Sequence, residues 1–378
     1  MRWLLLILSG LYLFGCQDPQ ALPPDRQRLT LTETLGRDES AGYAKALAPR
    51  TFAFPADHGP HPEFKTEWWY YTGNLAAVDG RRFGYQLTFF RIALAPTAAE
   101  RPSAWGASQV SMAHFAVTDA AGKRFFNAER FARNALGLAG AQAEPFRVWL
   151  EDWQASAAQG SFPMRLQAAS DEVAIDLVLE PGKPVVLQGE QGLSRKSTEA
   201  GNASYYYSLT RMPTRGSLRL GEEEFQLTGH SWLDREWSTS ALAADQVGWD
   251  WFALQLDDGF ELMYYQLRRQ DGSADPASAG VWVRPDGRGQ GLRQEDLTLE
   301  VTRTWSSSRG GRYPAGWRLH LPQQHLELTI EPLLADQELD ATIRYWEGAV
   351  KISGERAGKP VIGYGYVELT GYAEGGED

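Results

Sequence analysis

The chain has 378 residues and a formal net charge of -11, with 14 Trp, 15 Tyr and 16 Phe but a single cysteine. A negative net charge, with no basic cluster interleaved with aromatics, argues against nucleic acid as a partner. One cysteine excludes an internal disulfide and a cysteine metal cluster.

The N-terminus has the pattern of an export signal. An apolar run over residues 3–14 is too short to span a bilayer but has the length of a signal-peptide core. It ends in Leu13-Phe14-Gly15-Cys16, and a small residue before a lone cysteine is the lipoprotein-processing pattern, although Phe14 is bulkier than usual there. We predict that residues 1–16 are a lipoprotein signal peptide and that Cys16 is lipidated. An ordinary signal peptide or a buried free cysteine is the alternative.

The residues after the cysteine predict a membrane-anchored protein on a tether. Gln17, and not Asp, follows Cys16, which in a Gram-negative cell favours the periplasmic face of the outer membrane. Residues 17–48 are rich in Pro, charged residues and Ala and have almost no aromatics, which is typical of a linker.

From residue 52 onward, short runs of alternating aromatic and β-branched residues are separated by turn signals. Helical periodicity is hard to find, so the pattern predicts an all-β sandwich or barrel. The expected hairpins are residues 68–75 and 83–92 around Asp79-Gly80, 114–118 and 124–126 around Ala121-Gly122, and 249–256 and 260–267 around Asp258-Gly259, with further strands at 173–179, 217–220, 225–228 and 326–330.

An internal echo indicates two parts. The segments 69–91 and 251–268 each begin with a tryptophan-led strand, turn at Asp-Gly, and continue into a double aromatic and an arginine. Amphipathic hairpins also resemble one another by chance. We predict an N-terminal domain over residues 49–235 and a C-terminal domain over residues 236–378.

Residues 68–71 are four successive aromatics, Trp-Trp-Tyr-Tyr, in the first predicted strand. Side chains alternate sides along a strand, so one set faces the barrel interior and the other a neighbouring domain or a ligand. We place Glu67 and His114 near that interior. Trp68, Tyr70 and His114 are candidate ligand-binding residues, although such ladders also simply fill barrels.

The densest constellation of chemistry-bearing side chains is residues 229–237, followed by 248–251. On a strand, His230, Trp232 and Asp234 share one face. Together with Asp250 they offer acid and base groups among indoles, and apolar surroundings raise a carboxyl pKa so that a proton stays available. A tryptophan-rich core with a buried Asp–Arg pair is the structural alternative.

Other site types find little support. Gly229-His230-Ser231-Trp232 approaches a nucleophile elbow, but Leu233 replaces the final glycine and no helix follows. No histidine pair has metal-ligand spacing, and His58 and His61 lie in a Pro/Gly loop. No glycine loop leads from a strand into a helix. We therefore predict no metal and no cofactor.

At these residues the chain resembles the family that joins AttH-like secreted proteins to carotenoid 1,2-hydratase (hydroxyneurosporene synthase). The likeness runs from about residue 45 to the C-terminus. The segments that carry it are residues 64–75, 86–91, 114–119, 229–237, 345–348 and 365–371.

The resemblance implies two lipocalin-like β-barrels packed side by side, and an apolar ligand. It also implies hydration of an isoprenoid double bond without a cofactor, which requires an acid, aromatic faces for a tertiary cation and a group that orients water. We assign Asp234 or Asp250 as the acid and His230 as the water-orienting base. The aromatic box is Tyr207, Trp232, Trp249 and Trp251.

Export makes a carotenoid substrate doubtful, because carotenoid hydration belongs to a photosynthetic membrane pathway. A non-catalytic lipid carrier that works with an ABC transporter is therefore the alternative function, since lipocalin-type barrels hold one small ligand. A secreted hydrolase is the third, without a recognisable nucleophile.

Overall fold

The structure is a computed structural model that describes residues 40–97, 106–240 and 242–373. The predicted signal peptide, Cys16 and most of the predicted tether lie outside these ranges.

The first sheet is antiparallel and has 13 strands within the described residues. In spatial order they are β4 (Arg124–Arg133), β3 (Gln109–Asp119), β2 (Arg82–Ala93), β1 (Thr66–Ala77), β13 (Glu223–Ser238), β12 (Ala203–Leu220), β9 (Val173–Leu179), β8 (Met164–Ala169), β7 (Trp153–Ala157), β6 (Arg147–Leu150) and β5 (Ala139–Gln142), with β10 (Val186–Leu187) and β11 (Leu193–Arg195) beside β12.

The second sheet has 10 strands in the part of the chain that is described. Their order is β17 (Gly289–Arg293), β16 (Ala279–Val283), β15 (Glu261–Arg269), β14 (Gln246–Leu256), β25 (Lys359–Leu369), β24 (Tyr345–Arg356), β22 (Leu326–Pro332), β21 (Trp317–Leu321) and β18 (Thr298–Val301), with β23 (Glu338–Leu339) beside β24. The remaining elements are the small hairpin of β19 (Thr304–Ser306) and β20 (Arg312–Pro314) and three 3-10 turns, η1 (Ala56–His58), η2 (Gln294–Asp296) and η3 (Pro322–Gln324). Within the described ranges, no helix has the length and apolarity needed to cross a membrane.

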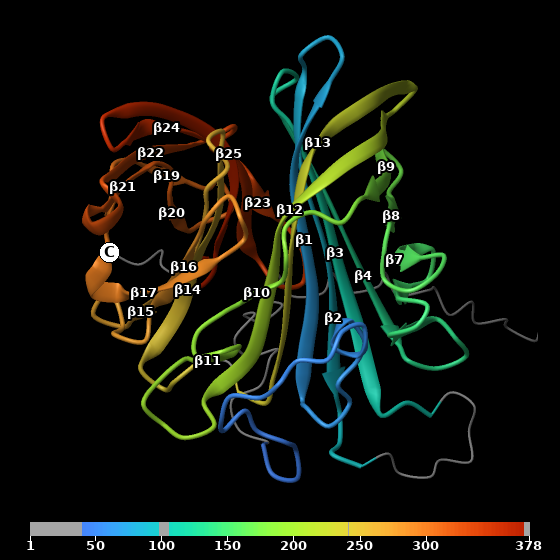
Figure 1. Cartoon of the computed structure of the whole chain (residues 1–378). Coiled ribbons are helices and arrows are strands. Elements are labelled where there is room, and N and C mark those ends of the chain that lie inside the picture. Colours follow the sequence, from blue (N-terminus) through green and yellow to red (C-terminus); the bar gives the residue numbers. More distant parts are fainter. Residues whose placement is uncertain (1–39, 98–105, 241, 374–378) are drawn as a thin grey trace, which may run out of the picture.

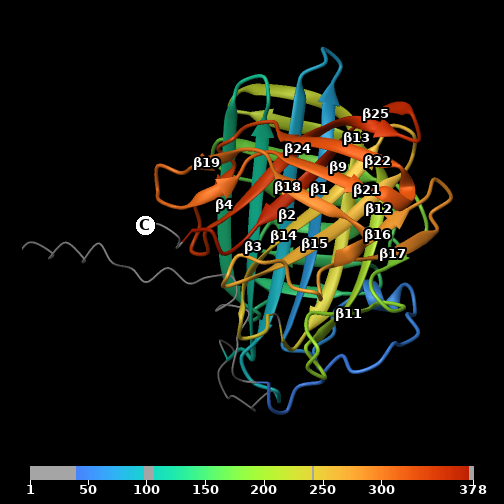
Figure 2. The same cartoon turned by 90° about the vertical axis from the view of Figure 1, so that its left-hand side faces the viewer.

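The all-β, two-barrel prediction is confirmed. The first sheet curls into a barrel and the second into a half-barrel, and the two lie side by side (Figure 1). Seen from the side, the orange strands of the second sheet cross the blue and teal strands of the first (Figure 2). The expected hairpins form: Asp79-Gly80 connects β1 to β2, Ala121-Gly122 connects β3 to β4, and Asp258-Gly259 connects β14 to β15.

The chain passes from one sheet to the other between Ser238 and Gln246. The domain boundary placed at Arg235/Glu236 by sequence therefore lies inside β13, whose last residues still pair with β1 and β12.

The alternation predicted for β1 is confirmed. Trp69 and Tyr71 lie in the core of the first barrel, whereas Tyr70 packs with Trp251 of β14 in a third apolar layer. That layer lies between the sheets, where the outer faces of β1, β12 and β13 meet those of β14, β15, β24 and β25. Asn74 of β1 also donates a hydrogen bond of 3.0 Å to the Gly365 carbonyl of β25. The interface between the sheets is thus both apolar and hydrogen-bonded.

The two sheets approach each other closely at Gly84, where there is no side chain. A Cβ atom at Gly84 of β2 would lie 2.3 Å from the Cβ of Ala349 on β24. We expect Gly84→Ala to lower the free energy of unfolding by about 1–3 kcal/mol, because the sheets must move apart. The matched control is Gly291→Ala in β17, where a Cβ meets nothing within 4 Å. Urea unfolding measures both, and an equal effect of the two would contradict close packing at Gly84.

Candidate functional site

A pocket lies between the two sheets and encloses about 750 Å³ of space, counting the part open to solvent. Aromatic side chains from both sheets form most of its wall: Trp68, Tyr70, Phe90, Tyr206, Trp249, Trp251 and Tyr265. Leu242 and Leu267 add apolar surface. The polar groups are Lys196, Asp234, Glu236, Ser240 and Glu368. The pocket therefore offers an apolar ligand a few ionisable groups at fixed positions.

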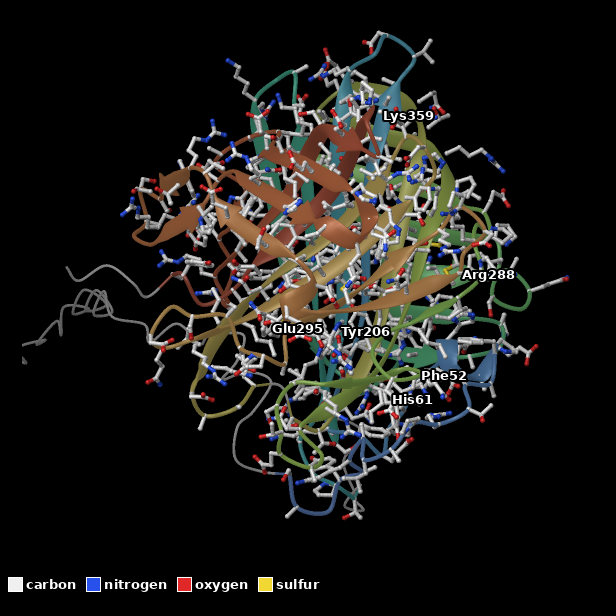
Figure 3. The ribbon with its side chains drawn as sticks, turned by 60° about the vertical axis from the view of Figure 1, so that its left-hand side comes forward. Phe52, His61, Tyr206, Arg288, Glu295 and Lys359 are labelled. Atoms are coloured by element: carbon white, nitrogen blue, oxygen red, sulfur yellow. The ribbon has the colours of Figure 1, made fainter. Side chains whose placement is uncertain are left out.

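Alternation of side chains along β12 and β13 explains why polar groups of the first sheet point into the pocket. On β13, Asp234 and Glu236 face the pocket, while Leu233 and Trp237 face the barrel core. On β12, Tyr206 faces the pocket for the same reason. Tyr206, labelled in Figure 3, is buried, and all three groups lie on strands and not on loops.

Asp234 is buried, with an exposed fraction of 3%, and accepts hydrogen bonds on both oxygens. Ser208 Oγ donates over 2.5 Å and Trp232 Nε1 over 2.7 Å to Oδ1, and the Tyr206 hydroxyl donates to Oδ2. Burial raises the pKa of Asp234 to about 7 against these stabilising donors, and the nearby Glu236 carboxylate adds to the rise. Asp234 therefore changes protonation near neutral pH.

Glu368 of β25 faces Asp234 from the second sheet. Burial raises the pKa of Glu368 to about 8, and the negative charges of Asp234 and Glu236 add to the rise. Its Oε1 accepts a hydrogen bond of 2.9 Å from Trp249 Nε1, which is the only side-chain hydrogen bond to Glu368 among the described residues. Glu368 is therefore a neutral carboxylic acid at pH 7 with a proton to donate.

The raised pKa predicts how stability depends on pH. Between pH 4.5 and about 8 the native state keeps the Glu368 proton while the unfolded chain loses it, so the free energy of unfolding falls as pH rises through this window and levels off above it. Because each tenfold change in proton affinity is worth about 1.4 kcal/mol, the total is a few kcal/mol. We expect Glu368→Gln to remove this fall. The check is urea unfolding of both proteins from pH 5 to 9, and parallel pH curves would contradict the burial of an acid here.

Glu236 and Lys196 form the charged end of the pocket. Lys196 Nζ lies 3.1 Å from Glu236 Oε1 and 4.1 Å from the centre of the Tyr265 ring. Burial would lower the pKa of Lys196, but the Glu236 carboxylate outweighs it and holds this pKa above its ordinary value. The ammonium therefore stays charged and balances one of the three carboxyl groups.

The structure brings together five of the residues selected from the sequence. Trp68, Tyr70, Asp234, Trp249 and Trp251 line the pocket. Trp232 lies behind them, where its ring packs edge-on against Trp251 at 6.5 Å and its Nε1 holds Asp234.

Two predicted catalytic residues are not brought to the pocket. Asp250 faces the interior of the second sheet, where Arg268 Nε lies 2.9 Å and the Tyr372 hydroxyl 3.1 Å from its carboxylate. Its neighbours Trp249 and Trp251 face the pocket, so alternation turns Asp250 away. His230 shares the face of Asp234 but lies four residues along β13, roughly 13 Å away at strand spacing. It is half-buried and does not line the pocket.

Two predicted ligand-binding residues also lie elsewhere. Tyr207 is on the barrel-core face of β12, with its hydroxyl 2.6 Å from His58 Nδ1, so Tyr206 takes the position expected for it. His114 lies on the outer face of β3 and not near the barrel interior, 2.7 Å from the Tyr345 hydroxyl and 3.0 Å from Glu129. It ties the two sheets together.

The sequence analysis did not select these polar residues of the pocket: Lys196, Tyr206, Glu236, Ser240 and Glu368. Glu236 could have been predicted, because it is two residues after Asp234 on the same strand and therefore points to the same face. Glu368 lies in the C-terminal segment 365–371 that supports the family resemblance, but no spacing in the sequence links it to β13. Among the described residues, no group of three or more His, Cys, Asp or Glu side chains is arranged to hold a metal ion.

Comparison with known proteins decides the family. The model of the AttH-like family matches residues 45–372. The chain belongs to the AttH-like family. This AttH-like chain is 35% identical to a putative AttH from Nitrosomonas europaea of known structure, with a TM-score of 0.77 over 87% of this chain and 99% of that one. No curated protein matches the chain.

More distant structures share the fold. Kievitone hydratase from Nectria haematococca is 16% identical, with a TM-score of 0.67 over 88% of this chain and 97% of that one. CghA with Sch210972 is 13% identical, with a TM-score of 0.54 over 87% and 95%. The two-barrel architecture of the AttH-like family is thus also that of a hydratase.

Proposed function

We propose that this AttH-like chain is a cofactor-free hydratase that adds water across a carbon–carbon double bond of an apolar, isoprenoid-like molecule. The observation that carries the proposal is Glu368, a carboxylic acid kept neutral in a pocket lined mostly by aromatic side chains. The hydratase among the proteins of the same fold supports it.

The first step is protonation of the alkene. Glu368 gives its proton to one alkene carbon, the π bond supplies the electron pair, and the other carbon becomes a cation while Glu368 becomes a carboxylate. A pKa of about 8 suits this role, because the acid is loaded at neutral pH and yet gives up its proton readily. Trp249 donates to Glu368 throughout and stabilises the carboxylate that forms.

The cation that results needs electron-rich neighbours. The rings of Trp68, Trp249 and Trp251 line the pocket from both sheets, and aromatic faces attract cations. The carboxylates of Asp234 and Glu236 add negative potential in a medium that screens it weakly. A tertiary carbocation forms more easily than a secondary or primary one, so this environment favours a branched, isoprenoid-type alkene as substrate.

Addition of water completes the reaction. A water oxygen bonds to the cationic carbon and passes a proton to the Tyr206 oxygen, while Tyr206 passes its own proton to Asp234. The Tyr206 hydroxyl already donates to Asp234 and accepts from Trp251 Nε1 over 3.1 Å, so it is oriented for this transfer. The proton then returns from Asp234 to Glu368, and the net change is one water added.

The two carboxyl groups predict a bell-shaped pH dependence. Glu368 must be protonated, so kcat falls as pH rises through about 8. Asp234 must be ionised, so kcat also falls as pH drops below about 7. The two limbs belong to the coupled pair and not to single residues. Steady-state kinetics from pH 5 to 10 measures the profile, and a rate that still rises above pH 9 would contradict an acid at Glu368.

The deciding experiment uses the protein lacking residues 1–16, purified from the host that makes it, because these residues carry the predicted export signal. Native mass spectrometry identifies a bound apolar molecule, and incubation in heavy-oxygen water tests for its hydration. A product heavier by one labelled water establishes the hydratase. A bound lipid that stays unchanged favours instead the carrier, for which an ABC transporter is the expected partner.

A further inference from the structure

A second cavity lies in the mouth of the first barrel, beneath the segment that contains Pro60 and Pro62. It encloses about 600 Å³, counting the part open to solvent. Trp69, Phe89, Val148 and Trp149 give it apolar surface, and Arg91, Ser111, Asn134 and Gln109 give it polar groups. Trp69 and Phe89 point into the barrel, whereas Trp68 and Tyr70 line the pocket between the sheets, and Phe90 borders both cavities.

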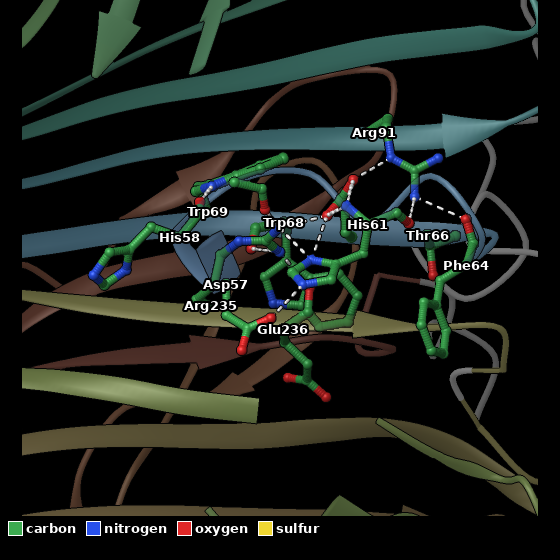
Figure 4. A network of polar contacts seen from close by, with 12 residues as sticks. Asp57, His58, His61, Phe64, Thr66, Trp68, Trp69, Arg91, Arg235 and Glu236 are labelled. Carbon is green, nitrogen blue, oxygen red and sulfur yellow. Dashed lines mark hydrogen bonds and ion pairs between the residues drawn. The ribbon is translucent and has the colours of Figure 1, made fainter. Parts of the chain in front are cut away.

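A buried ionic network borders this cavity (Figure 4). Glu67 is fully buried and accepts hydrogen bonds from Arg91 Nε on one oxygen and from Arg235 Nη2 on the other. The backbone N–H of His61 donates to the same carboxylate over 3.0 Å. Burial alone would raise the pKa of Glu67, but Arg235, His61 and Arg91 together hold it below its ordinary value.

The charges of this network do not balance. Two buried guanidinium groups, Arg91 and Arg235, face the single carboxylate of Glu67. The next carboxylate, Asp57, is already paired with Arg50 at 2.8 Å. Asp57 also lies 3.0 Å from His61 Nε2. Arg91 and Arg235 therefore share one carboxylate, and the two buried cations exceed that anion by one charge. Buried charges are normally paired, because leaving one unpaired costs several kcal/mol.

Two nitrogens of this network are buried without a hydrogen-bond partner in the described structure, Arg235 Nε and Arg91 Nη1, and of the two arginines Arg91 lines the cavity. Its Nη2 donates to the carbonyl oxygens of His61 at 3.0 Å and Phe64 at 2.7 Å, whereas its Nη1 is buried and has no partner in the described structure. Figure 4 shows this third nitrogen of Arg91 without a dashed line. Arg91 as a whole is 4% exposed.

Strand register places Ser111, another residue that lines the cavity, next to Arg91. Arg91 pairs with Glu67 across β1 and with Ser111 across β3. Beyond it, Ser111 Oγ donates to Asn134 Oδ1 over 2.7 Å, and Asn134 Nδ2 donates to Gln109 Oε1 over 3.3 Å. Arg91 is therefore flanked on the cavity side by hydroxyl and amide groups, which suit an anion, next to indole and phenyl surface.

We propose that this cavity binds a small amphiphilic carboxylic acid, with the carboxylate at Arg91 and the apolar part against Trp149 and Phe89. Arg91 then has an anion on each side, Glu67 and the ligand, and the surplus charge is neutralised. The site does not depend on the reaction proposed for the other pocket.

Isothermal titration of decanoate and decanol into the protein lacking residues 1–16, at pH 7.5, tests the proposal. We expect decanoate to bind at least about tenfold more tightly than decanol. Arg91→Met should weaken decanoate by at least about tenfold and leave decanol unchanged. Glu368→Gln, in the other pocket, should bind decanoate as the parent does.

The second variant keeps Arg91. Ala141 lines the cavity, and Ala141→Phe fills it, so this variant should lose decanoate even if Arg91→Met does not fold. Equal affinity for acid and alcohol, or full binding by Ala141→Phe, would overturn the proposal. A loss of decanoate in Glu368→Gln would also overturn it, because the probe would then occupy the pocket between the sheets.

Discussion

Replacing Glu368 by glutamine is expected to lower kcat for hydration by a factor of about 10² to 10⁴, the usual worth of a positioned general acid. Glutamine has the shape of the protonated side chain and can keep the hydrogen bond that Trp249 donates to Oε1. It has no acidic proton to give to an alkene. KM should change little, because the apolar wall that holds the substrate is intact. Product formation in heavy-oxygen water, followed by mass spectrometry, measures the rate.

The control for this variant is Glu331→Gln in the same sheet, where the carboxylate is partly exposed and pairs with Lys351 at 3.0 Å. It should keep the parent rate. If Glu368→Gln keeps more than about a tenth of kcat, Glu368 is not the acid. Asp234→Asn then decides whether the remaining carboxylic acid on the facing sheet has that role, as the sequence pattern suggests.

The second large effect is expected on stability. Glu67→Gln removes the carboxylate that two buried guanidinium groups share and leaves Arg91 and Arg235 without an ionic partner. Breaking a buried ion pair from one side typically costs about 3–5 kcal/mol, and here the change affects two cations. We expect a loss of that size in the free energy of unfolding, measured by urea denaturation at pH 7.

The matched control is Glu172→Gln, which removes a carboxylate from an exposed pair with Arg124. The side chains of that pair are 57% and 69% exposed, so the loss should stay below about 1 kcal/mol. Similar losses in the two variants would show that the barrel mouth is solvated and that the network is not a buried one. The difference in unfolding free energy between the two variants therefore measures the effect of burying the Glu67 carboxylate.

The family could be identified from long segments of sequence, and the fold class follows from local physics. Asp-Gly and Ala-Gly turns, separated by alternating apolar residues, leave antiparallel hairpins as the structure that satisfies the backbone. Alternation also determines which side chains share a face, so the sequence pattern groups Trp232 with Asp234 and separates Trp69 from Tyr70.

Alternation by itself does not say which face meets which layer, and this explains the errors. Tyr206 and Tyr207 are adjacent, and only the closure of the first barrel decides that Tyr207 fills the core while Tyr206 reaches the pocket. The same ambiguity misplaced Asp250, whose face was decided by the apolar interior of the second sheet.

What sequence alone determined about this protein is its family, its strands and the faces that residues share. Only the tertiary structure placed Glu368 in the same pocket as Asp234. This arrangement requires β25 to pair with β14 so that Glu368 lies beside Trp251, and it requires the outer faces of the two sheets to pack together. It alone also left Arg91 with a free nitrogen beside a cavity. Burial of apolar surface drives that packing but carries no direction, so the sequence pattern shows which faces are buried and not which faces meet.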